Sequence, residues 1–434
     1  MERNRISGIC AAVLICFVSC ANGNGQEPST TPEPAPVVKA VKPGIEVLRD
    51  GGFECLKGKR VGLVTNPSGV DSHLNSTIDI LFNAPEVNLV ALYGPEHGVR
   101  GNIYAGGSIP DSVDETTGLP VYSLYGSHRT PSPEMLEGID VMVYDIQDVG
   151  TRSYTFISTL GLVMRACAQS GKEVVVLDRP NPLGGRKVEG CYVEPGYFSF
   201  ISEFRIPYVY GLTVGELARL INEEGLNCGE KGNLPHETCS LTVIPMEGWN
   251  RDMVYSDTGL PWILPSPNIP TAWSAICYPS AGICGEFSNY LSIGVGTTIP
   301  FQTFAASWID PDALKARLDS YNIPGVDFRV IYFEPRFGSH EGELLKGVEY
   351  FYTDYASAVL TMTQFYVIQA VSELYPDKLP FELTKSMNIF DKVCGTDYVR
   401  KVFGARYKVS DLEPVWQKDV DEFRTISEKY YLYQ

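Results

Sequence analysis

The chain has 434 residues, about three times the usual domain length of roughly 150 residues, so we expect two domains. Apolar residues make up 44% and charged residues 20% of the sequence, which is typical of an ordinary globular protein. The formal net charge of -17, with no concentrated basic segment, argues against a nucleic-acid partner. An anionic ligand would require a locally basic pocket.

The N-terminus predicts an export signal. Two arginines precede an apolar run at 9–18, which is too short to span a membrane as a stable helix and ends just before Cys20. The small residue Ser19 directly before this cysteine resembles the lipobox of bacterial lipoproteins, although Phe17 stands where Leu is usual. We therefore predict a lipoprotein signal peptide over 1–20, with acylation of the cysteine; plain secretion is the alternative.

Residues 21–42 are rich in Pro, Gly, Thr and Glu and have no apolar periodicity, so we expect a disordered linker between the membrane and the folded domains. No acidic residue directly follows Cys20, which favours a location facing the periplasm, at the outer membrane. In that oxidising compartment Cys228 and Cys239, on either side of a Gly-containing loop, are the best candidates for a disulfide.

Strand and helix patterns alternate through the first half of the folded region. In chain order we predict strands at 59–66, 88–93, 140–144 and 172–178, and helices at 77–83, 133–138, 154–171 and 213–223. Thr213 and Glu216 have the spacing of a capping box at the start of the last helix. This alternation predicts an α/β fold with a Rossmann-like, mostly parallel sheet flanked by helices over 43–240.

The second half has a different pattern. Pro/Gly-rich segments follow Ser240, and a long helical stretch is predicted at 354–374. We expect 241–434 to form a smaller α+β C-terminal domain whose aromatic loops complete a cleft. No GxGxxG follows the first strand and no pair of histidines has metal-ligand spacing, so we expect neither a cofactor nor a metal.

A Glu-His pair follows the strand at 88–93. Glu96 and His97 lie in a tight loop between Pro95 and Gly98. Ligands of open α/β sheets bind beyond the carboxyl ends of the strands, and a partly desolvated carboxyl group there suits a general acid. A salt bridge between Glu96 and Arg100, with His97 in a turn, is the structural alternative.

A second polar run follows the strand at 140–144. It contains Asp145, Gln147, Asp148, Arg152 and Tyr154. One of the carboxylates is a candidate second catalytic group, and the arginine is a candidate for binding an anionic substrate group through two hydrogen bonds. The alternative is that Arg152 neutralises one of the aspartates.

Two further loops lie on the same predicted rim of the sheet. Asn66 follows the first strand and is a candidate substrate-binding residue, whereas Asp178 and Arg179 follow the fourth and are expected to pair with each other. No GxSxG motif is present, so a serine hydrolase of the α/β-hydrolase type is a minor hypothesis.

Five ordered motifs together resemble the NamZ family of exo-acting β-N-acetylmuramidases. They are Pro95–Gly98, Asp145–Gly150 with Arg152 and Tyr154, Asp178–Gly185, Gly211–Ala218 and Leu260–Trp262 with Pro265–Asn268. The resemblance covers roughly residues 44–434. It implies a Rossmann-like domain with a smaller domain, a cleft between them, and removal of terminal N-acetylmuramic acid from the non-reducing ends of peptidoglycan fragments.

The resemblance also implies site residues. The family's proposed catalytic glutamate falls on Glu96, with His97 beside it, and Glu286 joins the substrate-binding set. The lactyl carboxylate of the substrate requires a cation, for which Arg152 and Arg100 are our candidates. Peptidoglycan fragments, and the membrane through a lipid anchor, are the expected partners.

The chain departs from the family pattern at 285–296. Relatives read closer to Phe-Glu-Gly-Thr followed by Gly-Arg-Gly, whereas Val295 stands where Arg is expected here. This departure keeps two alternatives open: a glycosidase with altered glycan specificity, and a non-catalytic muropeptide-binding lipoprotein.

Overall fold

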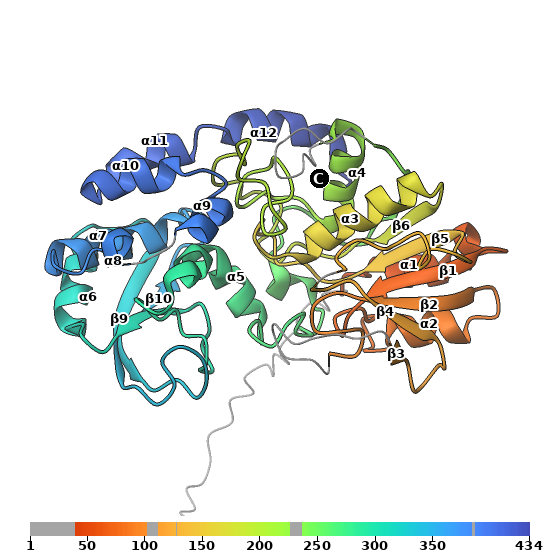
Figure 1. Cartoon of the computed structure of the whole chain (residues 1–434), viewed down its shortest axis with the longest axis horizontal. Coiled ribbons are helices and arrows are strands. Elements are labelled where there is room, and N and C mark those ends of the chain that lie inside the picture. The colour runs from red at the N-terminus through yellow and green to blue at the C-terminus, as the bar shows by residue number, and fades with distance from the viewer. Residues whose placement is uncertain (1–39, 102–111, 127, 226–236, 384–386) are drawn as a thin grey trace, which may run out of the picture. The chain divides into compact units, whose positions relative to one another are not determined.

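A mostly parallel sheet forms the first half of the protein (Figure 1). The structure is a computed structural model that describes residues 40–101, 112–126, 128–225, 237–383 and 387–434. In chain order the strands are β1 (Arg60–Thr65), β2 (Asn88–Gly94), β3 (Ser112–Val113), β4 (Pro120–Ser123), β5 (Val141–Asp145), β6 (Glu173–Leu177) and β7 (Ser240–Ile244). Their order in the sheet is β3-β4-β2-β1-β5-β6-β7, and every neighbouring pair is parallel except β3 with β4.

Helices cover both faces of this sheet. They are α1 (Gly44–Asp50), α2 (Thr77–Asn83), α3 (Phe156–Gln169) and α4 (Val214–Glu224). In β5, Met142 and Tyr144 pack in one core with α3 and α4, whereas Val141 and Val143 pack in another with α1 and α2. Strands buried on both faces read as continuous apolar runs, which is why the sequence pattern located them. The predicted α/β fold class is confirmed.

The start of α4 is fixed by its cap. The Thr213 hydroxyl accepts a hydrogen bond from the backbone N–H of Glu216 at 3.2 Å, and the Glu216 carboxylate accepts one from the backbone N–H of Thr213 at 3.1 Å. This is the predicted capping box, which satisfies two N–H groups at the helix start.

The second half contains a three-stranded antiparallel sheet with surrounding helices. Its strands are β8 (Thr303–Ala306), β9 (Val326–Phe333) and β10 (Leu345–Tyr352), in the order β8-β10-β9. Its helices are α5 (Ala272–Ala281), α6 (Pro311–Asp319), α7 (Met362–Leu374), α8 (Pro380–Leu383), α9 (Asn388–Cys394), α10 (Tyr398–Arg406), α11 (Val409–Trp416) and α12 (Val420–Ser427), with the short 3₁₀ turns η2 (Tyr255–Thr258), η3 (Gly282–Phe287) and η4 (Glu428–Tyr430). A further 3₁₀ turn, η1 (Glu54–Leu56), lies in the first half between α1 and β1.

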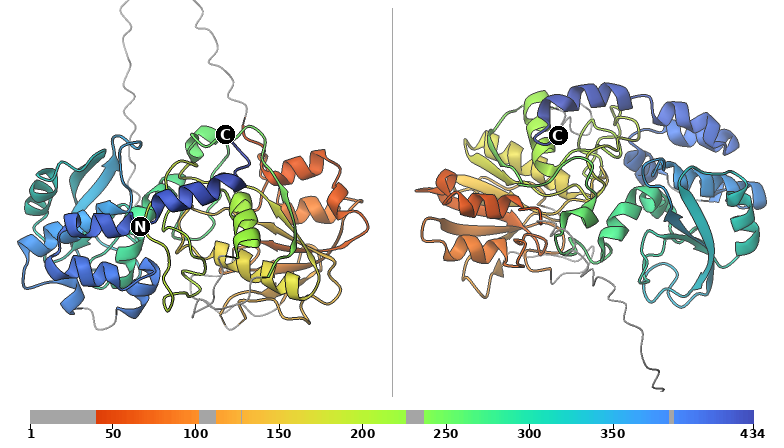
Figure 2. Two further views of the ribbon diagram at one scale, coloured as in Figure 1. Left: turned by 90° about the horizontal axis from the view of Figure 1, so that it is seen from above. Right: turned by 180° about the vertical axis from the view of Figure 1, so that it is seen from behind.

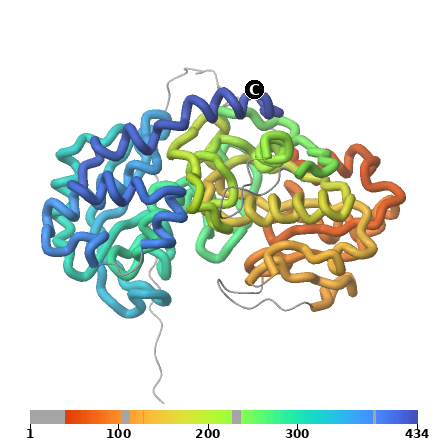
Figure 3. The backbone as a smooth tube through the Cα atoms, turned by 45° about the horizontal axis from the view of Figure 1, so that its top comes forward, coloured from red at the N-terminus to blue at the C-terminus, as the bar shows by residue number. Residues whose placement is uncertain are grey.

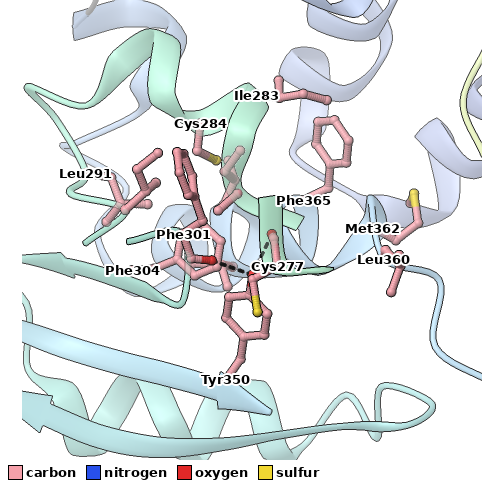
Figure 4. Close-up of a cluster of buried hydrophobic side chains, with 14 of the residues drawn as sticks. Cys277, Ile283, Cys284, Leu291, Phe301, Phe304, Tyr350, Leu360, Met362 and Phe365 are labelled. Atoms are coloured by element: carbon pink, nitrogen blue, oxygen red, sulfur yellow. Dashed lines mark hydrogen bonds between the residues drawn. The ribbon is translucent and has the colours of Figure 1, made fainter. Parts of the chain in front are cut away.

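A buried tyrosine joins this smaller sheet to α5 (Figure 4). The Tyr350 hydroxyl is close to the carbonyl oxygens of Cys277, at 2.9 Å, and Phe301, at 2.6 Å. Phe304 stacks on the Tyr350 ring with the centroids 5.7 Å apart. Since Cys277 lies in α5, these contacts fix that helix against the sheet, and the next segment, η3, carries Glu286.

Two predicted features differ in the structure. Residues 133–138 form turns rather than a helix, because the segment is shorter than two helical turns and Gly138 has a left-handed φ of 84°. The helix predicted from residue 354 begins only at Met362.

Among the described residues no helix is long and apolar enough to cross a membrane. Cys228 lies outside the described residues, and the Cys239 thiol lies 3.4 Å from Asn222 Oδ1.

The C-terminal segment returns to the first sheet, where α12 runs toward α4 (Figures 2 and 3). The Tyr433 hydroxyl donates to Asp178 Oδ2 at 2.6 Å, just beyond the end of β6. The same carboxylate accepts from the Thr213 hydroxyl at 2.7 Å and from the Gly215 N–H at 2.8 Å. Asp178 has no exposed surface, and burial raises its pKa to about 7. The expected pairing with Arg179 is wrong, because that guanidinium binds Asp145 instead.

The raised pKa of Asp178 predicts a pH-dependent stability. The folded chain holds a proton that the unfolded chain releases, so this contribution to the unfolding free energy is complete below pH 3.8 and is lost as the pH rises to about 7. Asp178→Asn resembles the protonated form at every pH. Denaturant unfolding should therefore show the variant gaining stability relative to the wild type across this window. A difference in unfolding free energy that stays constant with pH would contradict the assignment.

Candidate active site

The polar loops meet where the strand order of the sheet reverses. From β1 the chain adds β2 on one side and, later, β5 on the other, so the switch point lies between β1 and β5. These strands end together, with Thr65 paired to Asp145. Crevices at such points are the usual ligand sites of open α/β sheets. The loops after β1, β2 and β5, which carry the predicted site residues, therefore share one edge.

Glu96 lies in a strained turn after β2. His97 has a left-handed φ of 76°, which is uncommon for a residue with a side chain, and Gly98 follows with a φ of 75°. The N–H of Gly98 donates to the carbonyl oxygen of Pro95 at 3.0 Å, closing the turn. Strain of this kind concentrates at functional sites. The turn buries His97 and leaves the Glu96 side chain half-buried.

A tyrosine from the neighbouring loop contacts this carboxylate. Tyr125 follows β4, which pairs with β2 through Gly94 and Ser123. Burial raises the pKa of Tyr125 to about 12, and its hydrogen bond to Glu96 adds to the shift. Glu96 is therefore held from the β4 side of the sheet edge.

Asp145 is committed to an ion pair. Its carboxylate accepts hydrogen bonds from Arg179 Nε at 2.5 Å and Nη2 at 2.9 Å, and a further one from the Thr77 hydroxyl. Asp145 has no exposed surface and Arg179 is 5% exposed. A neutralised carboxylate with no access to solvent is not placed to act on a substrate, so the catalytic role expected for Asp145 is replaced by a structural one.

Asp148 retains a carboxyl oxygen without a partner. Oδ2 accepts hydrogen bonds from the Tyr210 hydroxyl and, at 2.7 Å, from the Gly150 N–H. Oδ1 is buried and has no hydrogen-bond partner among the described residues. Burial raises the pKa of Asp148 to about 6. The group can therefore exchange a proton close to neutral pH.

Two tyrosines bring three carboxyl groups together. Tyr154 and Tyr278 meet edge to face, with ring centroids 5.7 Å apart. Burial raises the pKa of Tyr278 to about 12, and the negative charge of Glu286 adds to the shift. Asp148 and Glu96 add to it in the same way, and both also raise the pKa of Tyr154, for which burial is again the largest cause. Side chains from both halves of the chain therefore converge here.

Glu286 is the carboxyl group of this cluster that comes from the C-terminal half. It lies in η3, its side chain is only partly exposed, and burial raises its pKa to about 7. No hydrogen bond or ion pair to its carboxyl group occurs within the described parts of the chain. A protonated, partly buried carboxyl group with open hydrogen-bonding capacity is what a proton donor requires.

Arg152 has a structural role in place of the expected substrate contact. It has no exposed surface, and its guanidinium donates to four backbone carbonyls. These belong to Cys191 at 2.9 Å, Ile206 at 2.5 Å, Val393 at 3.0 Å and Cys394 at 2.8 Å. Two of the four lie at the end of α9, so Arg152 joins the loop after β5 to the C-terminal half.

Arg100 is also occupied. It binds both carboxylate oxygens of Asp114, at 2.9 and 3.0 Å, and approaches Asp79 at 3.4 Å. The alternative pairing of Arg100 with Glu96 is therefore not the arrangement found. Neither of the two arginines that the sequence suggested has a free guanidinium edge to offer a substrate carboxylate.

The two predicted amide residues hold the loops in place. The Asn66 side chain donates to the carbonyl oxygen of Pro265 at 3.1 Å, and its Oδ1 accepts from Ser68. The Gln147 side chain donates to the carbonyl oxygens of Asp148 at 2.8 Å and Pro180 at 2.7 Å. Because these donors are committed to the backbone, they shape the edge of the site; substrate binding by either residue stays a prediction.

A cluster of carboxyl groups at the switch point of a mostly parallel sheet is typical of an α/β enzyme that uses acid–base catalysis. Family models described as the N-terminal and C-terminal parts of the exo-beta-N-acetylmuramidase NamZ match residues 61–273 and 276–433. The chain is 42% identical over 393 residues, covering 91% of each sequence, to the peptidoglycan beta-N-acetylmuramidase NamZ of Bacillus subtilis (strain 168). The chain therefore belongs to the NamZ family.

Two solved structures from Bacteroides fragilis NCTC 9343, both described as DUF1343 family proteins, share the fold. One has a TM-score of 0.86 and 52% sequence identity, and the other a TM-score of 0.70 and 30% identity. Each comparison covers 91% of this chain and 99% of the other. The fold is therefore shared with both structures over 91% of the chain.

Proposed function

We propose that the protein is an exo-acting glycoside hydrolase that removes terminal β-linked N-acetylmuramic acid from the non-reducing ends of peptidoglycan fragments. The main structural support for this function is the convergence of Glu96, Asp148 and Glu286 on Tyr278, whose ring contacts Tyr154. The curated relative, which matches over 91% of both chains, is named for beta-N-acetylmuramidase activity on peptidoglycan. Glycosidic hydrolysis needs two carboxyl groups, and the cluster provides them.

The chemistry follows from the two roles. One carboxyl group gives its proton to the glycosidic oxygen as the bond to the anomeric carbon breaks, and a carboxylate assists the attack at that carbon or the water that completes hydrolysis. Glu96 is proposed as the carboxylate. Asp148 and Glu286 are the candidates for the proton donor, because the pKa is raised to about 6 in Asp148 and to about 7 in Glu286.

Two substrates with different leaving groups distinguish Asp148 from Glu286 as the proton donor. Replacing the proton donor should reduce hydrolysis of a natural disaccharide by about 10²–10⁴-fold, yet spare an aryl glycoside whose activated phenol leaves without protonation. We expect this pattern for Glu286→Gln rather than Asp148→Asn, because the Asp148 carboxylate is held by Tyr210 and Gly150. The wild type should lose activity above about pH 7 as Glu286 is deprotonated, and this loss should be absent in Glu286→Gln. Equal losses on both substrates for Glu286→Gln would contradict this assignment.

Defined glycan ends test the exo-acting mode. Fragments that begin with muramic acid at the non-reducing end should release free N-acetylmuramic acid, whereas fragments that begin with N-acetylglucosamine should remain intact. Mass spectrometry of the products after short incubation separates the two cases. Cleavage within long chains would contradict exo-acting hydrolysis.

We propose further that the protein is a lipoprotein facing the periplasm, at the outer membrane, with Cys20 as the lipidated residue. Support comes from the apolar run at 9–18 and the small residue before the cysteine; these positions lie outside the described residues. Cys20→Ser should move the protein from the membrane fraction to the soluble fraction of cells. An unchanged distribution would reject the anchor.

One observation favours a second candidate function, an altered glycan specificity. Val295 is partly buried and packs against the C-terminal core between Gly294 and Gly296. An apolar side chain cannot supply the charge of the arginine expected there. A non-catalytic muropeptide-binding protein is the limiting case, which would bind fragments without turnover and equally well after Glu96→Gln.

A further inference from the structure

The arginines that follow the parallel strands of the first sheet are almost all occupied. Their partners are Asp114 for Arg100, four backbone carbonyls for Arg152, Asp145 for Arg179, Asp252 for Arg186 and Glu216 for Arg251. Within the described ranges, Arg129, in the loop after β4, has neither an ion pair nor a hydrogen bond from its side chain. It is the arginine at this edge whose charge is left for a ligand.

The position of Arg129 is linked to Glu96. The ends of β4 and β2 lie side by side, with Gly94 paired to Ser123. Between that end and Arg129 lies Tyr125, whose hydroxyl bonds to Glu96. The positive charge of Arg129 acts on that hydroxyl, opposing the rise of its pKa that burial and Glu96 cause. The guanidinium therefore lies within electrostatic reach of the catalytic edge.

The contact that Arg129 does make leaves its hydrogen-bond donors open. Its guanidinium carbon lies 4.3 Å from the centroid of the Phe200 ring. Stacking on an aromatic face orients the planar group, while the N–H groups remain in the plane and point outward. An oriented fork of this kind matches a carboxylate, which accepts two parallel hydrogen bonds.

We propose that Arg129 binds the lactyl carboxylate of the terminal muramic acid residue and so determines the preference for muramic acid over N-acetylglucosamine. This inference rests on the proposed function. The two sugars differ by the lactyl ether, which carries the only negative charge of the terminal residue. In a protein with a formal net charge of -17, that group needs a local cation.

The test compares two aryl glycosides of N-acetylmuramic acid, one with the free lactyl carboxylate and one in which it is a neutral carboxamide. The wild type should prefer the free acid. Arg129→Met should lower kcat/KM for the acid by about 10–100-fold, the range expected for a charge-assisted hydrogen bond, and leave the amide nearly unchanged. Arg129→Lys keeps the positive charge but loses the planar pair of N–H donors, so its kcat/KM for the acid should lie between those of the wild type and Arg129→Met.

The control is Arg186→Met, which removes a 61% exposed arginine paired with Asp252 and should change neither substrate. Equal melting temperatures verify that the variants fold. A wild-type preference for the acid that survives in Arg129→Met would overturn this inference and leave the proposed function intact. A wild type that hydrolyses neither muramic glycoside would reject the proposed function itself, and this inference with it.

Discussion

Glu96→Gln is expected to reduce release of a chromophore from an aryl β-glycoside of N-acetylmuramic acid by at least about 100-fold, the usual contribution of a catalytic carboxyl group. Glutamine keeps the shape of the side chain and its hydrogen bond with Tyr125, but it cannot carry the negative charge that assists attack at the anomeric carbon, a step that an aryl glycoside still requires. The strained turn around His97 should therefore stay folded while the chemistry is lost. Initial rates at saturating substrate measure the effect on kcat directly.

Glu137→Gln is the matched control, because this glutamate is exposed and lies in a turn away from the tyrosine cluster. It should retain full activity. If Glu96→Gln were as active as this control while its melting temperature stayed at the wild-type value, the catalytic role of Glu96 would have to be abandoned.

Arg179→Met is expected to cause the largest loss of stability, about 3–5 kcal/mol, because it leaves the buried Asp145 carboxylate without its counter-charge. The pair is buried on both sides, with side-chain exposure of 5% for Arg179 and 0% for Asp145. The remaining hydrogen bond from Thr77 cannot neutralise the carboxylate. Denaturant unfolding, read as a change in the midpoint at constant slope, measures the loss.

Two comparisons make that result specific. Arg186→Met, which breaks an exposed ion pair to Asp252 with exposures of 61% and 73%, should cost no more than about 1 kcal/mol. Arg179→Met combined with Asp145→Asn should regain part of the lost stability, because the unpaired charge is removed. A loss for Arg179→Met no greater than for Arg186→Met would contradict the structural assignment of the pair.

The central part of the fold could be predicted because its local signals are strong. The strands β1, β2, β5 and β6 are buried on both faces and so read as continuous apolar runs, and Thr213 with Glu216 marks the start of α4. The strand β4 was missed, since four residues with an N-terminal proline give little pattern. That omission also hid Tyr125 and Arg129 as residues of the site.

The positions of acidic residues were predictable, but their partners were not. The sequence placed Glu96, Asp145 and Asp148 at the ends of two strands, β2 and β5, which lie on either side of β1. Only the packing shows that Arg179 neutralises Asp145. Arg152 looked suited to bind an anion because its spacing cannot reveal backbone carbonyls more than two hundred residues away in sequence, in α9. Tyr278 was missed for the same reason: it reaches the cluster from the C-terminal half. A Tyr in a Pro/Gly-rich segment was its only local signal.

The most direct test of the proposed activity compares chromophore release by the wild-type protein from the β-linked aryl glycosides of N-acetylmuramic acid and N-acetylglucosamine. An exo-acting β-N-acetylmuramidase should turn over the first glycoside rapidly and the second little or not at all. Equal turnover of both glycosides, or binding of muramic fragments with no turnover of either, would contradict the assignment as an exo-acting β-N-acetylmuramidase.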